Sequence, residues 1–230
     1  MASQWRSPVF PKWFQSKCTN ITTGIILGLM PLGSSWAAQP ALPKLLQEVK
    51  AKYAKTGTLS ADFSQVNEDA ALTGKKKQSS GKILVKRPKI RWEIQKPNPS
   101  LLISDGQSYW FYTPPFDEGE RGQVIVKKAS QIQSKLVDAL LSGSFTPEQF
   151  SKIIPKGDRV FQLVPKLGTS GTVALATIEV DSEKKLIQKV SLEHKGGNRT
   201  EVTLSNIDLG TSLEDSLFRF SPPPNTDVVK

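Results

Sequence analysis

The chain has 230 residues, 37% of them hydrophobic and 23% charged, and its 31 basic and 21 acidic residues give a formal charge of +10. These proportions are those of a globular protein and exclude a disordered or fibrous chain. A positive charge is compatible with nucleic-acid, membrane or acidic protein partners. The basic residues are nevertheless spread along the sequence, and the one dense run is Lys75–Lys77. Because neither a clustered basic face nor a binding motif is visible, we expect no nucleic-acid partner.

The N-terminal segment has the features of an export signal. Residues 1–37 contain three basic residues and no acid, and an apolar segment covers 21–32. Small residues at Ser35 and Ala37 fit cleavage after Ala37. The apolar segment is shorter than the ~20 residues that a membrane-spanning helix needs, although an uncleaved anchor remains the alternative. We therefore predict a signal peptide over residues 1–37 and a single domain over residues 38–230.

Cleavage would remove the only cysteine, Cys18, and would lower the formal charge from +10 to +7, since three basic residues leave with it. An exported chain without cysteine has no disulfide, so its core alone must hold it together, which a chain of this length can do. Cys18 follows Gln15-Ser16-Lys17, which is a poor context for lipid attachment. We expect a monomer that is soluble after export and is not itself lipid-anchored.

The pattern of apolar residues predicts three helices. Residues 41–56 place five apolar side chains at helical spacing, with Pro43 suited to the first turn and Gly57 to the end. A second apolar stripe lies in residues 130–142. The third helix is expected to begin at Thr146-Pro147-Glu148 and to continue through Phe150, Ile153 and Ile154. The first helix could be an ordinary amphipathic helix on a core or a movable cover, and the pattern is compatible with both.

The rest of the chain has the alternation and turn residues of β-strands. We expect a polar loop over residues 67–80. Since sequential strands usually pair, the simplest arrangement is α+β and mainly antiparallel β: one curved sheet or incomplete, half-open β-barrel of about eleven strands, with the helices against its concave face. The expected strands cover residues 59–66, 81–87, 90–95, 101–104, 108–112, 123–127, 159–165, 173–181, 186–194, 199–207 and 217–220.

The stretch Gly81–Tyr112 organises this expected sheet. Alternation places Ile90, Trp92 and Ile94 on one face of a strand, opposite Arg91, Glu93 and Gln95. In the preceding strand, Ile83, Val85 and Arg87 share a face. Arg87 therefore lies at the end of an apolar row, where a charge is costly unless it is hydrogen-bonded. A sheet with one apolar face also needs a cover.

Residues typical of catalytic or metal sites are few. The only histidine is His194, and one histidine without a cysteine does not make a typical zinc site. Gly168-Thr169-Ser170-Gly171 lacks the spacing of a nucleophile elbow, and no glycine-rich phosphate loop is present. We therefore expect no enzymatic activity, no cofactor and no metal. A hydrolase built on a pair of carboxylates is the alternative that the sequence leaves open.

Several motifs along the central stretch resemble one known family. These motifs are Val85-Lys86-Arg87-Pro88, Arg91-Trp92-Glu93, Leu102-Ile103-Ser104-Asp105-Gly106 and Trp110-Phe111-Tyr112, with Ala61-Asp62-Phe63-Ser64-Gln65 upstream and Phe218-Arg219-Phe220-Ser221-Pro222-Pro223 downstream. In this order they resemble the periplasmic outer-membrane lipoprotein carriers of the LolA type, over nearly all of the mature chain. One difference is the short segment Lys89-Ile90, where family members often have an extra residue and an aromatic side chain.

The resemblance implies a half-open barrel of about eleven strands with a three-helix lid. It further implies a periplasmic carrier that takes acylated lipoproteins from an inner-membrane lipoprotein-releasing ABC transporter. The carrier would shield their acyl chains and deliver them to an outer-membrane acceptor lipoprotein of the LolB type. Arg87 holds the place of the family's arginine that latches the lid.

Under this hypothesis the acyl chains bind between lid and sheet, whereas the alternative for each apolar residue is plain core packing. A second hypothesis is a periplasmic lipid-sensing regulatory module of the same fold that acts through a protein partner. The predicted acyl-chain-binding residues are Leu45, Leu46, Val49, Ile83, Val85, Ile90, Trp92, Leu102, Trp110, Leu136 and Leu140.

Overall fold

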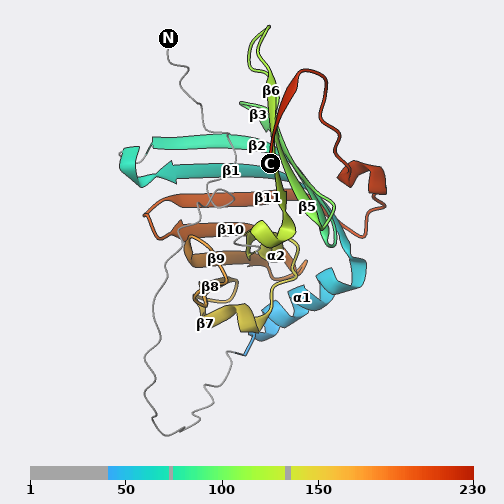
Figure 1. Ribbon diagram of the computed structural model, residues 1–230. Helices are drawn as coiled ribbons and strands as arrows, with labels where there is room; N and C mark the ends of the chain where they lie inside the picture. Colours follow the sequence, from blue (N-terminus) through green and yellow to red (C-terminus); the bar gives the residue numbers. More distant parts are fainter. Residues whose placement is uncertain (1–40, 73–74, 133–135) are drawn as a thin grey trace, which may run out of the picture.

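A computed structural model describes residues 41–72, 75–132 and 136–230, and its strands form one twelve-stranded sheet (Figure 1). The strand order is β12-β6-β5-β4-β3-β2-β1-β11-β10-β9-β8-β7. All neighbouring strands are antiparallel except β12, which runs parallel to β6. The elements are α1 (Lys44–Thr56), β1 (Thr58–Asp69), β2 (Lys75–Lys86), β3 (Lys89–Lys96), β4 (Ser100–Ser104), β5 (Ser108–Thr113), β6 (Gly122–Lys128), α2 (Leu136–Leu141), β7 (Phe150–Pro155), β8 (Val160–Pro165), β9 (Val173–Asp181), β10 (Leu186–His194), β11 (Arg199–Leu209) and β12 (Thr226–Val229).

The sheet is strongly bent and remains open. In Figure 1, β1, β2 and β9–β11 run almost horizontally, whereas β3–β6 stand at a steep angle to them, and α2 lies in front of the sheet. Strands β12 and β7 are at the two edges of the strand order, so the barrel does not close. The expected mainly antiparallel, incomplete barrel is confirmed, with twelve strands instead of about eleven.

Gly81 allows β2 and β3 to approach closely at the bend. The register of this pair shifts between Ser80 and Gly81, as at a β-bulge, which increases the local twist. A Cβ atom on Gly81 would overlap the backbone carbonyl of Glu93. Phe63 lies opposite Gly81 on β1, and its ring packs against Trp92 of β3, with centroids 4.6 Å apart.

We expect Gly81→Ala to lower the free energy of unfolding by about 3 kcal/mol, because backbone atoms of β3 must move to admit the methyl group. Urea denaturation followed by circular dichroism would measure this loss. Gly196→Ala is the matched control, since nothing lies within 4 Å of the position that its Cβ would take. Equal stability of the two variants would show that the bulge tolerates a side chain.

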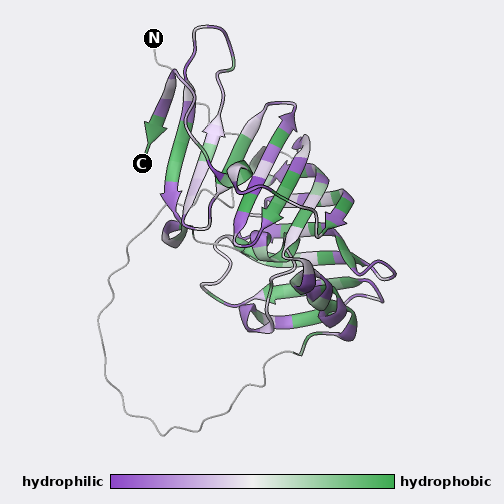
Figure 2. Ribbon diagram, turned by 90° about the vertical axis from the view of Figure 1, so that its right-hand side faces the viewer, coloured by the Kyte–Doolittle hydropathy of each residue, from purple (hydrophilic) through white to green (hydrophobic). Residues whose placement is uncertain are grey.

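The alternating inward-facing residues of the strands and the apolar faces of both helices form one core. In Figure 2, apolar and polar residues alternate along the strands. Burial in β3 follows the same period: Ile90, Trp92 and Ile94 are buried, whereas Arg91 and Glu93 are only partly covered. The predicted faces of this strand are therefore confirmed. The core lies between the concave face of the sheet and the two helices.

The first predicted helix is confirmed, although α1 begins at Lys44 rather than at Ala41. Gly57 ends it with a positive φ of 70°, and the Gly57 backbone N–H donates to the Tyr53 carbonyl. The second predicted helix, over residues 130–142, is confirmed only in part. α2 covers Leu136–Leu141, whereas Ala129–Gln131 forms a short 3-10 turn and residues 133–135 lie outside the described part of the chain.

The third predicted helix is wrong, so the described residues contain two α-helices rather than a three-helix lid. Pro147–Gln149 forms only a short 3-10 turn, after which Phe150–Pro155 becomes β7 and pairs with β8. Phe150, Ile153 and Ile154 have helical spacing, but pairing with β8 gives the backbone of this segment hydrogen-bond partners along one side. The two β-branched isoleucines also fit a strand better than a helix.

Two other predictions from sequence need correction. Residues 67–80, expected as a polar loop, largely extend β1 and β2 into a long hairpin, where opposite charges such as Glu68 and Lys76 face each other across the strands. The tail strand expected at 217–220 is instead a 3-10 turn over Asp215–Phe218, and the last strand is β12. The predicted signal peptide, residues 1–37, lies outside the described residues.

Candidate functional site

The predicted acyl-chain-binding residues of the sheet, apart from Trp110, meet on the concave face. The register aligns Ile83 with Trp92 and Trp92 with Leu102, in one row across β2, β3 and β4. Val85 pairs with Ile90 in the next row. All five side chains are buried in the same core cluster. Adjacent strands thus form a continuous apolar wall, as side-chain alternation requires.

The predicted lid residues pack against this wall. Leu46 and Val49 of α1 are fully buried, and Leu45 is half-buried against the same cluster. Leu136 and Leu140 project from α2 into the cluster as well. Helical spacing puts these side chains on one face of each helix. The two helices therefore cover the concave wall with their own apolar side chains.

Trp110 does not join the cluster, so its predicted place there is wrong. On β5 the inward-facing residues are Tyr109 and Phe111, and alternation turns Trp110 to the convex face. There the Trp110 ring packs against Phe220, with centroids 6.5 Å apart. The C-terminal segment that carries Phe220 covers this outer face, which the sequence pattern alone did not indicate.

The guanidinium of Arg87 binds the C-terminal end of α1. Its Nη2 lies 3.0 Å from the Tyr53 carbonyl oxygen and 3.1 Å from that of Ala54. The Arg87 backbone N–H also donates to the Gly57 carbonyl at 3.2 Å. The last carbonyls of a helix have no partner within the helix and carry its negative dipole end. Arg87 thus neutralises this end and joins α1 to the β2–β3 turn.

Two further contacts hold the helices, and both involve the hydroxyl group of a tyrosine. The Ile187 backbone N–H donates to the buried Tyr53 hydroxyl at 3.1 Å, so α1 is also tied to β10. Burial raises the pKa of Tyr53 to about 12. The Tyr109 hydroxyl donates to the Asp138 carboxylate at 3.2 Å, which connects β5 with α2. Helical spacing cannot reveal such contacts, because it contains no information about the partner strand.

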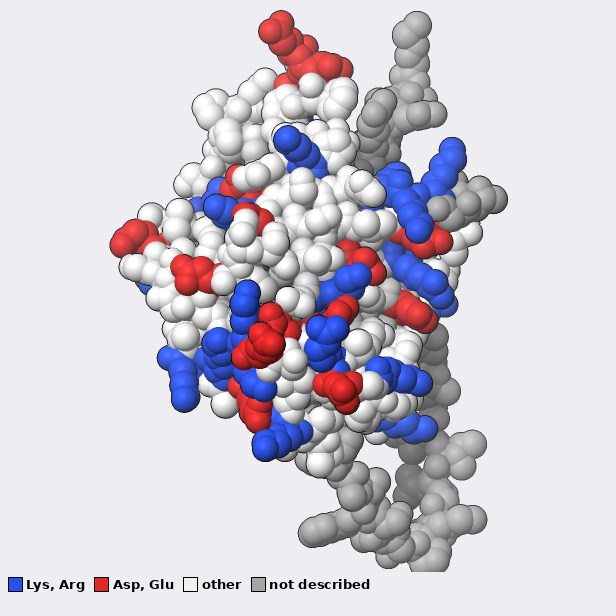
Figure 3. Space-filling view, turned by 180° about the vertical axis from the view of Figure 1, so that it is seen from behind, with Lys and Arg blue, Asp and Glu red and all other residues white. Residues whose placement is uncertain are grey.

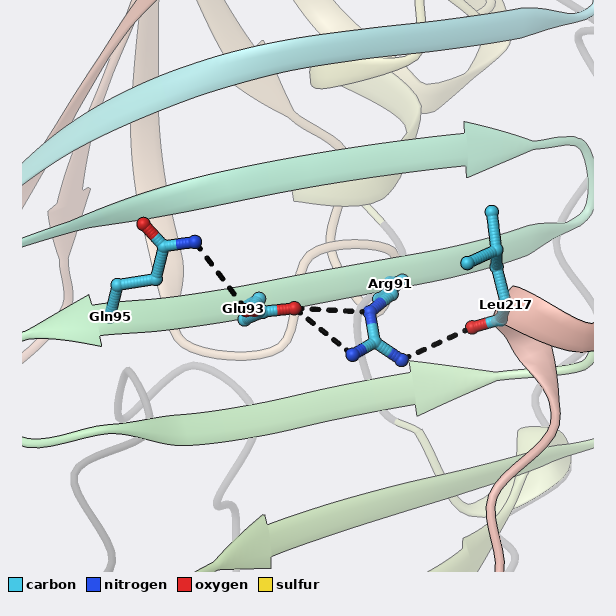
Figure 4. A network of polar contacts seen from close by, with 4 residues as sticks. All are labelled: Arg91, Glu93, Gln95 and Leu217. Carbon is cyan, nitrogen blue, oxygen red and sulfur yellow. Dashed lines mark hydrogen bonds and ion pairs between the residues drawn. The ribbon is translucent and has the colours of Figure 1, made fainter. Parts of the chain in front are cut away.

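The convex face of β3 carries a polar network (Figure 4). Arg91 forms an ion pair with Glu93 at 3.0 Å, and Gln95 donates to the other carboxylate oxygen of Glu93. Nη1 of Arg91 also donates to the Leu217 carbonyl at 3.3 Å. The next pair of contacts lies at the β2–β3 turn, where Lys86 and Lys89 both contact Asp215. These contacts attach the C-terminal segment to the outside of the sheet.

Basic and acidic side chains are interspersed over the lower half of the surface seen in Figure 3. Among the described residues, several charged side chains pair across strands, as Lys189 does with Glu201 at 3.2 Å and Arg199 with Glu193 at 3.8 Å. Exposed pairs of this kind contribute little to stability. The mixed charges seen in Figure 3 mean that this face does not present a uniform basic surface.

The described residues contain no group of three or more His, Cys, Asp or Glu side chains placed to hold a metal ion. His194 is buried at the end of β10, where its Nδ1 lies 3.0 Å from the Thr172 hydroxyl oxygen, and burial lowers its pKa. Within the same residues, no helix is both long and apolar enough to cross a membrane.

The family model and the similar sequences point to the same protein family. The family model "Outer membrane lipoprotein carrier protein LolA" matches residues 54–221. An outer-membrane lipoprotein carrier protein from Dechloromonas aromatica is 34% identical over 76% of this chain and 82% of its own length. A protein of the same name from Methylococcus capsulatus is 32% identical over 74% of this chain and 80% of its own.

Among solved structures, a LolA superfamily protein from Nitrosomonas europaea aligns with a TM-score of 0.43 and 11% identity, over 76% of this chain and 96% of that one. The family match covers most of the chain, including the α1 C-terminus, Arg87 and the whole concave wall. The chain therefore belongs to the LolA family of outer membrane lipoprotein carrier proteins.

Proposed function

We propose that this protein is a periplasmic carrier that shields the acyl chains of lipoproteins released from the inner membrane and delivers them to the outer membrane. The observation that supports the proposal most is the apolar cluster between the concave wall and two helices that are tied to the sheet by a few polar contacts. Membership of a family of carriers, and not of enzymes, agrees with this role.

In this proposal the acyl chains take the place of lid side chains on the concave wall. The predicted binding residues other than Trp110 already pack together there, so binding requires α1, α2 or both to move away. Burial of acyl chain gains ~0.8 kcal/mol per CH₂ group. Ten such groups supply ~8 kcal/mol, which corresponds to roughly micromolar affinity before the cost of ordering. Such binding would hold cargo and still permit release to a stronger acceptor.

Arg87 would act as the latch of this lid, because its guanidinium bonds to the terminal carbonyls of α1. The protein would receive cargo from an inner-membrane lipoprotein-releasing ABC transporter and would transfer it to an outer-membrane acceptor lipoprotein. It would do so as a soluble monomer of residues 38–230, after removal of the signal peptide 1–37. No metal or cofactor takes part in this scheme.

The proposal can be tested on the protein that lacks residues 1–37. This protein is titrated with an acylated lipopeptide and, separately, with the same peptide without acyl chains. Trp92 and Trp110 are the only tryptophans left after that removal. Because Trp92 is part of the concave wall and Trp110 lies outside the cluster, we expect the acylated form to change the fluorescence of Trp92. The change should persist in Trp110→Phe and disappear in Trp92→Phe. Equal responses to both peptides would contradict acyl binding.

A further inference from the structure

The carboxamide of Gln65 is buried on the concave side of β1 without a hydrogen-bond partner. Gln65 is 0% exposed, and neither Nε2 nor Oε1 has a partner within the described part of the chain. Its position follows from alternation, since it lies two residues after Phe63, which belongs to the core cluster. Buried amides in native proteins are nearly always paired, so an unpaired one at this place calls for a physical explanation.

The neighbours of Gln65 make its isolation clear. In register it lies between Val202 of β11, which is fully buried, and Ser79 of β2. The row continues from Val202 to Val190 on β10, so that side of the carboxamide is apolar. Two residues further along β1, the carboxamide oxygen of Asn67 does have a partner, because the Thr200 hydroxyl donates to it at 2.9 Å.

Gln65 marks the point where the inner face of β1 changes from apolar to polar. Leu59, Ala61 and Phe63 are buried apolar residues that precede it, and Asn67 follows it. An acyl chain also changes from apolar to polar along its length. It has a hydrocarbon tail that ends in one carbonyl group, which is attached as an ester or an amide. A tail that lies along the apolar part of this row would bring its carbonyl end to the carboxamide.

We infer that Gln65 is a polar contact for the carbonyl end of a bound acyl chain, an inference that rests on the proposed carrier function. The Gln65 Nε2–H donates to the carbonyl oxygen of an ester-linked or amide-linked chain. The Gln65 Oε1 is then available to accept an amide N–H from the lipidated residue. The ligand thus satisfies a buried group that is unpaired in the protein alone, which favours acyl groups over plain hydrocarbon.

The test compares two lipopeptides with equal chain lengths, one with ester-linked acyl chains and one with ether-linked alkyl chains that lack the carbonyl. We expect the wild-type protein to bind the ester about tenfold more tightly than the ether, a difference of ~1.4 kcal/mol. Gln65→Met keeps the size and removes both polar atoms, so the ester-to-ether ratio should fall to about one while the ether is bound as before.

Gln78→Met is the matched control, because this glutamine is exposed on the other face of β2 and should leave the ratio unchanged. An unchanged ratio in Gln65→Met, with both lipopeptides bound, would overturn the inference and leave the carrier function intact. If the wild-type protein bound neither lipopeptide, the carrier function itself would fail, and the inference with it.

A second measurement needs no ligand. Since Gln65→Met removes two unpaired polar atoms from the core, it should raise the melting temperature of the free protein by about 2–4 °C. A lower melting temperature would mean that the carboxamide contributes to the fold of the free protein, and this would contradict the inference. Gln78→Met should leave the melting temperature unchanged.

Discussion

Replacing Arg87 by methionine is expected to free the C-terminal end of α1 and to tighten the binding of acylated cargo. The substitution removes two hydrogen bonds from a charged donor to the Tyr53 and Ala54 carbonyls. Bonds of this kind contribute about 1–3 kcal/mol to the closed arrangement. Cargo must displace the lid, so its affinity rises by the factor by which the open form is enriched. For this loss of hydrogen bonding, the factor is about 5-fold to 150-fold.

Two measurements on Arg87→Met check this expectation. Hydrogen exchange of the α1 amides should become faster, and the dissociation constant for an acylated lipopeptide should fall. Lys55→Met is the control, since it removes an exposed positive charge from the last turn of the same helix. If exchange accelerates but affinity does not change, opening of α1 is not the step that limits binding. If neither changes, Arg87 is not a latch.

Replacing Leu46 by glutamate is expected to have the largest effect on cargo binding. The Leu46 side chain is fully buried in the cluster, where an unpaired carboxylate would cost several kcal/mol. The helix must therefore turn this position toward water, and its apolar face can no longer cover an acyl chain. We expect affinity for an acylated lipopeptide to fall at least about 100-fold, as measured by Trp92 fluorescence.

The substitution Ala51→Glu provides the control, because Ala51 is exposed on the same helix. It introduces the same charge and should bind cargo like the wild-type protein. Circular dichroism must show that Leu46→Glu keeps its β-sheet. A folded Leu46→Glu protein with wild-type affinity would remove Leu46 from the site and would favour plain core packing for this residue.

Local patterns in the sequence predicted much of the fold. Alternation in β3 identified the buried Trp92 and its partly covered neighbours, and Gly57 marked the end of α1. The awkward place of Arg87 at the end of an apolar row pointed to a hydrogen-bonded arginine, and its partners are indeed backbone carbonyls. Each of these features depends on residues that are close together in the chain, within one helix or one strand. Local interactions therefore determine them.

Contacts between distant segments could not be predicted in this way. Phe150–Pro155 has helical spacing but becomes β7 because β8 offers backbone partners. Trp110 faces outward because the register of β5 against β4 and β6 turns Tyr109 and Phe111 inward, and the C-terminal segment then covers it. The sequence by itself determined which residues are apolar and how they alternate. Only the tertiary structure decided which helix and sheet faces cover one another, and it left the Gln65 carboxamide unpaired. The reason is that burial and hydrogen bonding depend on neighbours that are far away in the chain.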